Sequence, residues 1–280
     1  IIGFAAMAFF TIIPYTAWKK IIYVLFFVSI FSIFLVKTSL GVEVYGATRW
    51  LEIGLGGRTI SIQPSELTKV AVILATALFI SRFQSYLGNI KAYLLALAFS
   101  GSGALLVMLL TDDLGTGIII FGMGLIMLFI AVPKKKYVIY TLFIIAALGV
   151  VYVLIRPTKL VRVKAWLNVD AYASDESYQI IQSLYAIGSG GFFGKGLGKS
   201  TQKMGFVPEG ENDMIFSIIC EELGIAGALI YIALIAILLW RCVKIFKETD
   251  DIFGKIIVAG VASHIGIQSV VNLMVVTSII

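Results

Sequence analysis

Charged residues, cysteine and histidine are scarce in this 280-residue chain, and their scarcity excludes several classes of protein. Only 14% of the residues are charged, whereas 60% are hydrophobic. A soluble domain of this length would place its apolar residues at periods of 3.6 or 2, but the long apolar stretches here are apolar on nearly every side. The one histidine and two cysteines form no cluster that offers a zinc site. Cys220 and Cys242 lie about 33 Å apart on one predicted helix, too far for an intrachain disulfide.

What the chain has in place of charge is a series of apolar stretches of about 17 to 25 residues, long enough to cross the hydrocarbon core of a membrane. We therefore expect an all-α, polytopic membrane helix bundle formed by one transmembrane domain, 1–280. The expected spans are residues 1–17, 20–37, 65–82, 91–110, 114–132, 137–155, 213–240 and 254–276. No start methionine or charged leader precedes the first stretch, and the chain stops at Ile280 after an apolar segment. We expect both ends of a longer protein to be missing.

The distribution of lysine and arginine predicts the topology. Lysine and arginine counts are about equal on the two sides, but long loops translocate largely regardless of charge, so the short connections decide. Basic residues occur in each short connection that follows the first, third, fifth and seventh stretches: Lys19, Lys20, Arg82, Lys91, Lys134, Lys135, Lys136, Arg241, Lys244, Lys247 and Lys255. We expect these connections to be cytoplasmic, and the loops 38–64 and 156–212 to be extracytoplasmic. Because the net charge of +6 is divided among separate loops, nucleic acid is not an expected partner.

The first outer loop and the helix start that follows it have two interpretations. Pro64 suits the first turn of a helix, and Glu66 complements the positive helix end and can pair with Lys69 three residues later. These residues describe a capped helix with a local ion pair. Alternatively, Arg49, Lys69 and the helix N-terminus face an anionic headgroup, since exposed helix N–H groups bind phosphate well. Trp50 fits either a substrate contact or an interfacial anchor.

Asp112 and Asp113 form a short turn between two apolar stretches. The favoured interpretation is a solvated turn in which Asp113 caps the next helix. A role in holding a cation or a sugar is the alternative.

The large loop carries basic residues and a glycine-rich run. Six glycines between Gly188 and Gly198 allow the backbone to turn repeatedly or to approach a ligand closely. The run reproduces only parts of the spacing of a nucleotide-binding P-loop, so it is not interpreted as one.

Asp213 is the strongest candidate for chemistry, because it opens the seventh expected span. On a helix, residues 213, 217, 220, 224 and 227 share one small, polar face, which we expect to point into the bundle interior or a wet cavity. Glu221 and Glu222 lie off this face and are interpreted as structural partners of loop arginines.

The last expected span carries a second polar stripe. His264, Gln268 and Asn272 recur every four residues, which is typical of hydrogen bonding between helices rather than of metal binding.

Taken together, these residues resemble the SEDS family, the FtsW, RodA and SpoVE polymerases of bacterial cell-wall synthesis. The similarity covers essentially the whole chain. The motifs that carry it, in chain order, are Gly46-Ala-Thr-Arg-Trp50, Gln63-Pro-Ser-Glu66 with Lys69, Asp113-Leu-Gly-Thr116, Tyr178-Gln179 to Gln182-Ser183, Ala186-Ile-Gly-Ser-Gly-Gly191, Gly194 to Gly198, Pro208-Glu209, Asp213 with Ile215-Phe216, and Glu221-Glu-Leu-Gly224. Each motif alone is weak, but the ordered set is specific.

The resemblance implies about ten transmembrane helices in the full protein, eight of them in this chain. It implies a multi-pass protein of the bacterial cytoplasmic membrane that polymerises lipid II into a nascent glycan strand at the outer face. It implies a class B penicillin-binding protein as partner, in cell division, elongation or sporulation. The family's essential aspartate matches Asp213. The substrate-binding candidates are Arg49, Trp50, Gln63, Ser65, Glu66, Lys69, Arg162, Gln179, Ser183, Lys203 and Glu209.

Glycan polymerisation needs a base, because a sugar hydroxyl must lose its proton as it attacks an anomeric carbon. We assign this role to Asp213. A single carboxylate without a covalent partner predicts an inverting displacement, since a retaining enzyme needs a second carboxylate about 5 Å away. Cationic side chains, with or without a divalent ion such as Mg²⁺ or Mn²⁺, would offset the charge of the departing pyrophosphate. Those assigned are Arg49, Lys69, Arg162 and Lys203.

Two other functions are compatible with a polytopic chain. A lipid II flippase predicts charged residues near the membrane midplane, whereas the candidates here gather at the outer ends of the expected helices. A non-catalytic scaffold of the division or elongation machinery predicts that substitution of Asp213 leaves growth unharmed.

Overall fold

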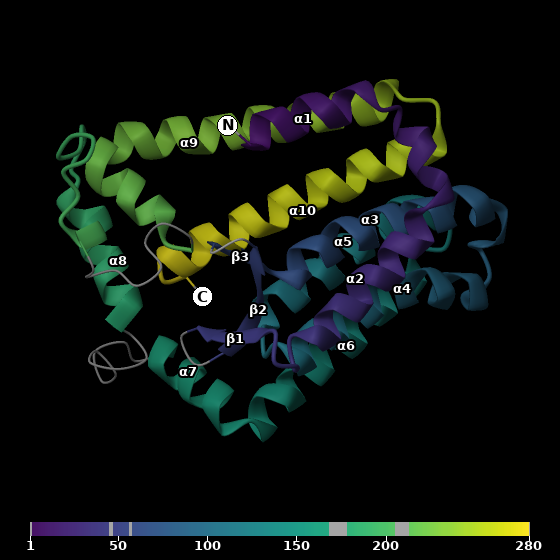
Figure 1. The fold of residues 1–280 in the computed structure, drawn as a ribbon, viewed down its shortest axis with the longest axis horizontal. Coiled ribbons are helices and arrows are strands. Elements are labelled where there is room, and N and C mark those ends of the chain that lie inside the picture. The colour runs from purple at the N-terminus through teal and green to yellow at the C-terminus, as the bar shows by residue number, and fades with distance from the viewer. Residues whose placement is uncertain (1, 45–46, 56–57, 168–177, 205–212, 280) are drawn as a thin grey trace. The chain divides into compact units, whose positions relative to one another are not determined.

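The computed structural model describes all residues except 1, 45–46, 56–57, 168–177, 205–212 and 280 (Figure 1). Within the described residues, five helices are long and apolar enough to cross a membrane: α4 (Ile90–Leu110), α5 (Leu114–Ala131), α6 (Lys136–Ile155), α9 (Ile215–Glu248) and α10 (Ile252–Val276). α1 (Ile2–Ile12) and α2 (Ile22–Leu35) are shorter, and α3 (Pro64–Phe83) carries more charge. Each of the eight expected spans contains one of these helices. The all-α membrane bundle is therefore confirmed.

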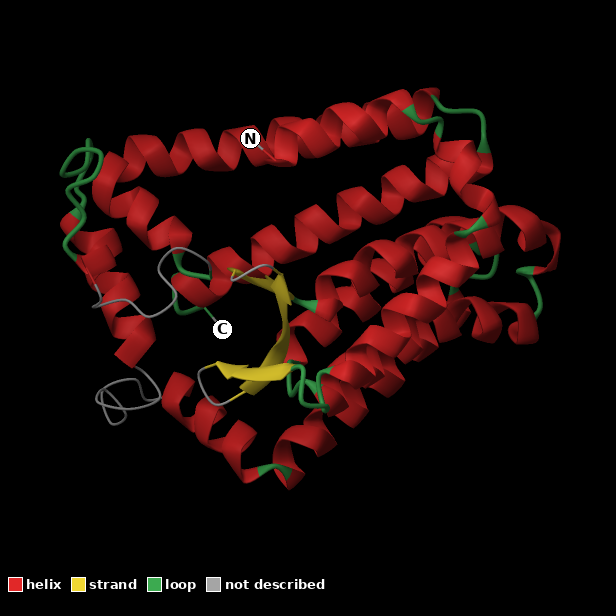
Figure 2. Cartoon of the chain, viewed as in Figure 1, coloured by secondary structure: helices red, strands yellow, loops and turns green. Residues whose placement is uncertain are grey.

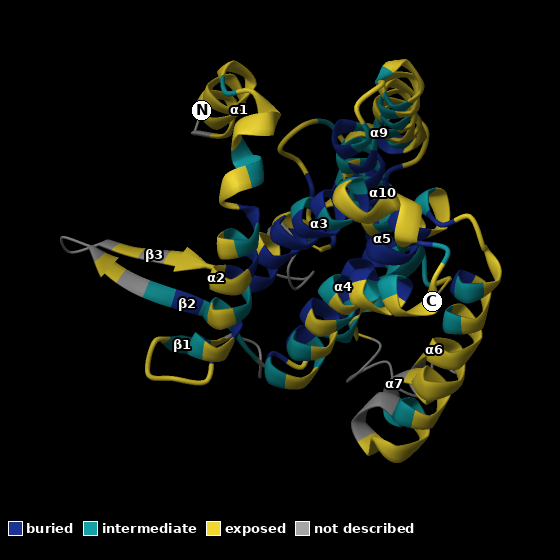
Figure 3. Ribbon diagram, turned by 90° about the vertical axis from the view of Figure 1, so that its right-hand side faces the viewer, coloured by how far each residue is buried: buried dark blue, intermediate teal, exposed yellow. Residues whose placement is uncertain are grey.

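The outward side chains of these helices are apolar, as a membrane protein requires. On α6, Phe143 and Ile155 are both 71% exposed, and Figure 3 shows almost the whole helix as exposed surface. On α9, Leu229, Ile230 and Trp240 are likewise exposed. Contiguous apolar surface of this kind is rare on proteins that are surrounded by water. It marks the faces that contact lipid.

The chain divides into two compact units, residues 1–138 with 242–264 and residues 139–241 with 265–280. The core of the first unit is formed by α2, α3, α4 and α5, whose buried side chains include Val72, Val107 and Ile120. α4 and α5 approach closely where small residues meet. A Cβ added to Gly124 would lie 2.2 Å from the Cβ of Ser100. Small residues at such contacts allow membrane helices to pack backbone against backbone.

A three-stranded antiparallel sheet occupies most of the first outer loop, and it was not predicted (Figure 2). Its strands are β1 (Gly41–Val44), β2 (Ala47–Leu55) and β3 (Arg58–Ile62), in the order β1-β2-β3. Val42 pairs with Trp50, and Leu51 pairs with Ile62. The segment is rich in β-branched residues, which favour a pleated strand. The sheet fixes Arg49 and Trp50 on its central strand.

The large outer loop also contains regular structure that was not predicted. Two helices lie in it, α7 (Pro157–Leu167) and α8 (Tyr178–Ser189), together with the short 3-10 helix η4 (Gln202–Met204). Two further 3-10 helices, η1 (Tyr15–Lys20) and η2 (Gln84–Tyr86), lie in short connections. α8 buries Ser183 and Ala186 on one face. The loop is therefore partly a packed element of the second unit.

The seventh expected span is broken at Gly224. This residue has φ 68° and ψ −164°, so α9 consists of an outer segment before Gly224 and a long segment after it. The glycine-rich loop covers the break. The N–H groups of Ile225 and Ala226 donate to the carbonyls of Gly191 and Phe192, at 3.0 and 3.1 Å. In return, the carbonyls of Glu221 and Glu222 accept from the N–H groups of Lys195 and Gly196, each at 2.9 Å.

Substituting Gly224→Ala should destabilise the protein, since the new Cβ would lie 2.4 Å from the carbonyl oxygen of Phe192 and φ is positive. A non-glycine residue in this region, which is populated almost only by glycine, costs about 1–3 kcal/mol before any clash is counted. The check is thermal unfolding in detergent. Gly149→Ala is the control, because its Cβ would meet nothing within 4 Å. An equal melting temperature for the two variants would contradict the described kink.

Asp251 connects the start of α10 to the N-terminal segment of the same unit. Its carboxylate accepts hydrogen bonds from the Gly254 N–H at 2.9 Å and the Tyr15 hydroxyl at 3.2 Å, and the Lys19 ammonium lies 3.9 Å away. The Gly254 hydrogen bond is the main cause that lowers the pKa of Asp251, with Lys19 and Tyr15 assisting against a partial loss of hydration. The charged form is thus favoured in the folded protein.

A folded-state pKa below the ordinary value means that Asp251 stabilises the fold above about pH 4 and loses this contribution as the pH falls further. Asp251→Asn should lower the melting temperature at pH 7, and its difference from the wild type should shrink as the pH falls below about 4. The comparison is melting temperature against pH, with the exposed neighbour change Asp250→Asn as control. A difference that grows on acidification would refute the assignment.

Candidate active site

Asp213 lies in a two-residue turn that precedes α9, and its side chain is exposed. Its backbone carbonyl accepts a hydrogen bond from the Asn272 side chain of α10 at 2.6 Å. The next residue, Met214, is buried in a cluster with Phe216, Cys220 and Val276. Asp213 is therefore held at its backbone and by its apolar neighbour, while its carboxylate stays accessible.

The outer segment of α9 carries a buried carboxylate, Glu221, whose side chain is 0% exposed. Its oxygens accept hydrogen bonds from the Lys195 ammonium at 2.6 Å, from the Ser200 hydroxyl, and from the N–H groups of Thr201 and Gln202 at 3.2 and 3.3 Å. A buried charge is tolerated when it is paired and its remaining lone pairs are satisfied. Glu221 meets both conditions and anchors the loop that follows the glycine-rich run.

Glu222 anchors the same loop a few residues further along. Its carboxylate pairs with the Lys203 ammonium at 2.7 Å and accepts from the Ser200 N–H at 3.3 Å. The two adjacent glutamates therefore secure successive parts of one segment, which continues through residues 205–212 to Asp213.

In the first unit, Arg49 on β2 meets the turn before α5. One guanidinium nitrogen lies 3.9 Å from the Asp113 carboxylate, and another donates to the Asp112 carbonyl at 3.4 Å. Asp113 also caps α5, where it accepts from the Thr116 N–H at 2.9 Å and from the Thr116 hydroxyl at 2.8 Å. The predicted capping role of Asp113 is confirmed, and its second partner is Arg49. The Nε of Arg49 is buried and makes no hydrogen bond among the residues described.

At the start of α3, Pro64 occupies the first turn and Lys69 pairs with Glu66 at 2.8 Å. The predicted cap and ion pair are therefore present. The pair is asymmetric, because the Lys69 side chain is 2% exposed while that of Glu66 is 55% exposed. Lys69 is therefore a buried cation, and the Glu66 carboxylate that pairs with it lies at the surface.

The cell cycle protein family that comprises FtsW, RodA and SpoVE matches residues 1–280. This chain belongs to the FtsW/RodA/SpoVE family.

Among relatives, the chain is 36% identical over 282 residues to stage V sporulation protein E of Bacillus subtilis (strain 168), covering 100% of this chain and 75% of that protein. It is 35% identical over 269 residues to a probable peptidoglycan glycosyltransferase FtsW of Trichlorobacter lovleyi, covering 95% of this chain and 69% of that protein.

Two solved structures share the fold. One is described as "Structural coordination of polymerization and crosslinking by a peptidoglycan synthase complex", with TM-score 0.76, 23% identity and coverage of 98% of this chain and 76% of that one. The other is the rod shape determining protein RodA of Thermus thermophilus, with TM-score 0.60, 22% identity and coverage of 93% and 67%. The membrane bundle is thus the fold of the FtsW/RodA/SpoVE family.

The predicted site residues fall into the two units of this family member. Those of the first unit are Arg49, Trp50, Gln63, Ser65, Glu66 and Lys69, and the described ones of the second unit are Gln179, Ser183, Lys203 and Asp213. Ser183 points inward and donates to the Val276 carbonyl at 2.9 Å. Arg162 lies on α7, but its side chain, like all of Glu209, lies outside the described residues. The roles of all these residues in substrate binding stay predictions.

Two predictions about α9 require correction. The face that begins at 213 is buried at Ser217, Cys220, Gly224 and Gly227 as expected, but Asp213 itself is exposed, because the helix begins at Ile215. Glu221 and Glu222 pair with Lys195 and Lys203, whereas loop arginines were expected. The readable signal was the presence of two lysines, Lys195 within the glycine run and Lys203 after it.

Metal binding is not tested by the arrangement. Among the residues that the structure describes, no group of three or more histidine, cysteine, aspartate or glutamate side chains could hold a metal ion. Mg²⁺ characteristically uses few protein carboxylates and takes substrate phosphate oxygens as further ligands. A divalent cation bound together with substrate stays a prediction.

Glu221→Gln should loosen the loop that leads to Asp213, since Lys195 loses its counter-charge and an amide nitrogen meets N–H donors. Hydrogen bonds to a charged group contribute about 1.5–3 kcal/mol each to stability, and partial exposure of Lys195 reduces this, so a loss of about 1–3 kcal/mol is expected. The measurement is unfolding by SDS titration in detergent micelles. Glu248→Gln, at an exposed pair with Lys244, should change stability little. Equal effects would argue against an anchoring role for Glu221.

Proposed function

We propose that this chain is a peptidoglycan glycosyltransferase that polymerises lipid II at the outer face of the cytoplasmic membrane, with Asp213 as its general base. Membership of the FtsW/RodA/SpoVE family supports the activity, as do relatives that are themselves named peptidoglycan glycosyltransferases. The observation that carries the role of Asp213 is its accessible carboxylate on a backbone held by Asn272 and the buried Met214.

In the proposed reaction, the hydroxyl of one sugar attacks the anomeric carbon of another. The O–H bond breaks as Asp213 accepts the proton, the new glycosidic bond forms, and the bond to the lipid pyrophosphate breaks with its electron pair leaving on the phosphate oxygen. Such base assistance contributes about 10²- to 10⁴-fold in rate.

The stereochemical outcome follows from which carboxylates are available. A retaining enzyme would need a second carboxylate free to attack the anomeric carbon. Glu221 is fully buried with its oxygens occupied by hydrogen bonds, and Glu222 is paired with Lys203. Of the carboxylates that the structure describes on the outer segment of α9, these two are therefore not free to form a covalent intermediate. This supports a single displacement with inversion.

The cations proposed to face the pyrophosphate are already paired in the described structure. Lys69 is paired with Glu66 and Lys203 with Glu222, each closely, whereas Arg49 lies 3.9 Å from Asp113 and retains an Nε without a hydrogen bond. Arg49 is therefore the cation best placed to donate a hydrogen bond to a phosphate oxygen. Bound Mg²⁺ or Mn²⁺ would neutralise the charge that remains on the leaving group.

The proposed setting is the bacterial cytoplasmic membrane, with short basic connections inside and the loops of Arg49 and Asp213 outside. A class B penicillin-binding protein is the proposed partner. A solved structure of the same fold, described as a peptidoglycan synthase complex that coordinates polymerisation and crosslinking, supports this pairing.

Asp213→Asn should lower the rate of glycan polymerisation from purified lipid II by about 10²- to 10⁴-fold, because the amide cannot accept the hydroxyl proton. Its fold should be unchanged, since the side chain is exposed. The assay uses the full-length protein with its partner, and Glu43→Gln, another exposed outer-loop acid, is the control. Polymerisation at the wild-type rate by Asp213→Asn would remove the proposal. Transfer of lipid II between leaflets without any polymerisation would favour a flippase instead.

A further inference from the structure

The chain around the α3–α4 connection and the α5–α6 turn carries positive charge, and the flanking sequence contains no acid. No aspartate or glutamate occurs between Glu66 and Asp112 or between Asp113 and Asp170. The charge comes from Arg82 at the end of α3, from Lys91 at the start of α4, and from Lys134, Lys135 and Lys136 where α5 connects to α6. Within the described part of the chain, none of these five forms a salt bridge. They attract anions at the end that is predicted to be cytoplasmic.

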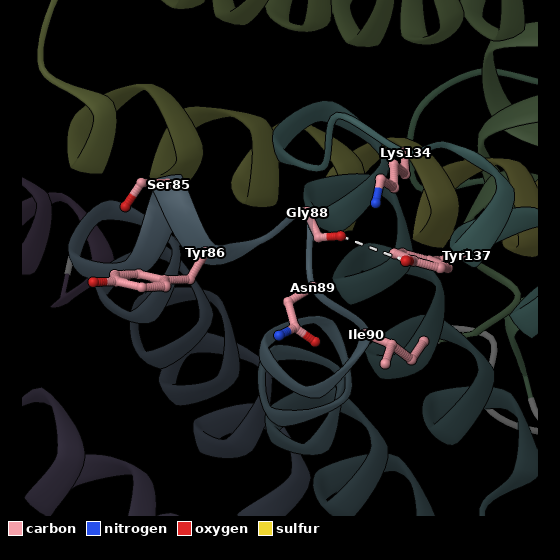
Figure 4. Close-up of a pocket in the computed structure, with 7 residues that line it drawn as sticks. All are labelled: Ser85, Tyr86, Gly88, Asn89, Ile90, Lys134 and Tyr137. Atoms are coloured by element: carbon pink, nitrogen blue, oxygen red, sulfur yellow. Dashed lines mark hydrogen bonds between the residues drawn. The ribbon is translucent and has the colours of Figure 1, made fainter.

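A pocket opens between these two connections (Figure 4). Its polar lining comes from Ser85, Tyr86 and Asn89 on one side and from Lys134 and Tyr137 on the other. The Tyr137 hydroxyl donates to the Gly88 carbonyl at 3.4 Å and joins the two walls. A hydrogen bond therefore joins the two walls of the pocket, and the Lys134 cation lies on its rim.

The side chains of the neighbouring cations have local contacts, whereas the Lys134 ammonium has none among the described residues. Lys135 folds back on the last carbonyls of α5, Phe129 and Ile130. Lys136 lies 5.9 Å from the centre of the Tyr137 ring. The exposed ammonium of Lys134 remains available to a ligand.

The Asn89 side chain supplies a donor beside this cation. Its oxygen accepts from the Lys91 N–H at 3.0 Å, as the cap of α4. Its amide nitrogen therefore keeps two hydrogens for a ligand, because the oxygen and not the nitrogen serves the helix. The Asn89 amide and the Lys134 ammonium therefore offer a donor and a positive charge, the requirements of a phosphate group.

The surroundings of the pocket are those of a membrane interface. Tyr86 is 66% exposed and lies in η2, directly after the end of α3. Exposed tyrosines at helix ends are typical of the headgroup level. Ile90, which also lines the pocket, is exposed and offers contact for a hydrocarbon chain.

We propose that this pocket binds the headgroup phosphate of an anionic phospholipid, with Lys134 and the Asn89 amide as its principal contacts. Basic pockets between membrane helices on the cytoplasmic side are suited to anionic headgroups. A lipid is favoured over free phosphate because one exposed lysine in an open site holds a soluble anion weakly, whereas acyl chains gain contact with the apolar helix surface. The site is separate from the chemistry proposed for Asp213.

The test is lipid retention by the purified full-length protein, measured by native mass spectrometry during titration with phosphatidylglycerol or phosphatidylcholine. Wild type should retain phosphatidylglycerol in preference, and Lys134→Gln should weaken that retention about fivefold. Lys134→Arg should restore it. The matched control is Lys247→Gln, an exposed lysine on α9 that does not line the pocket. Its retention should match that of the wild type.

Three results would overturn the proposal. Equal losses in Lys134→Gln and Lys247→Gln would indicate diffuse attraction rather than a site. Equal retention of the two lipids would remove anionic recognition. Displacement by soluble glycerol phosphate at concentrations comparable to the lipid would assign the pocket to a free phosphate. None of these readouts depends on glycan polymerisation, so failure of the lipid-binding proposal can be distinguished from failure of the proposed activity.

Discussion

The break in α9 at Gly224 is the constraint on which the packing of the glycine-rich loop in the second unit depends. Backbone groups freed inside a membrane helix must find partners within the protein, because lipid offers none. The glycine-rich loop provides two carbonyls and two N–H groups to the break. Gly190 and Gly194 permit the approach, since a Cβ at either would fall within 2.1 Å of the α9 backbone. Glu221 and Glu222 then hold residues 195–203, so the described part of the loop, residues 191–203, is attached to α9 on both sides of the break.

Much of this fold was predictable because its determinants are local in sequence. Spans are encoded by runs of apolar residues, and the structure places a helix in each expected span. The cap at Asp113, Pro64 in the first turn of α3 and the Glu66–Lys69 pair need only residues within three or four positions of each other. The hydrogen bond of Asn272 agrees with the predicted polar stripe, although its partner is a backbone carbonyl of a distant residue.

What escaped prediction depends on contacts across longer separations. The sheet of residues 41–62 lies in a polar loop that was interpreted through its motifs, and its pairing is not encoded by any single strand. Lys203 was assigned to pyrophosphate, but it meets Glu222, 19 residues away. The break at Gly224 could not be predicted from the sequence, because the apolar run continues through it. Its backbone groups bind to a separate segment, and hydrophobic periodicity carries no information about that segment. The exposure of Asp213 followed from a helix start two residues later than expected.

The backbone groups at the break in α9 are satisfied largely by hydrogen bonds to other main-chain atoms. Its four hydrogen bonds join positions 191, 192, 195 and 196 to positions 225, 226, 221 and 222 in a set register. An inserted or deleted residue between Gly190 and Gly196 would shift part of this ladder and carry Lys195 away from Glu221. Side chains at the exposed Phe192 and Phe193 can change without touching those bonds. In this stretch, the number of residues is therefore constrained together with the glycines and Lys195, and the two phenylalanines are the positions that tolerate change.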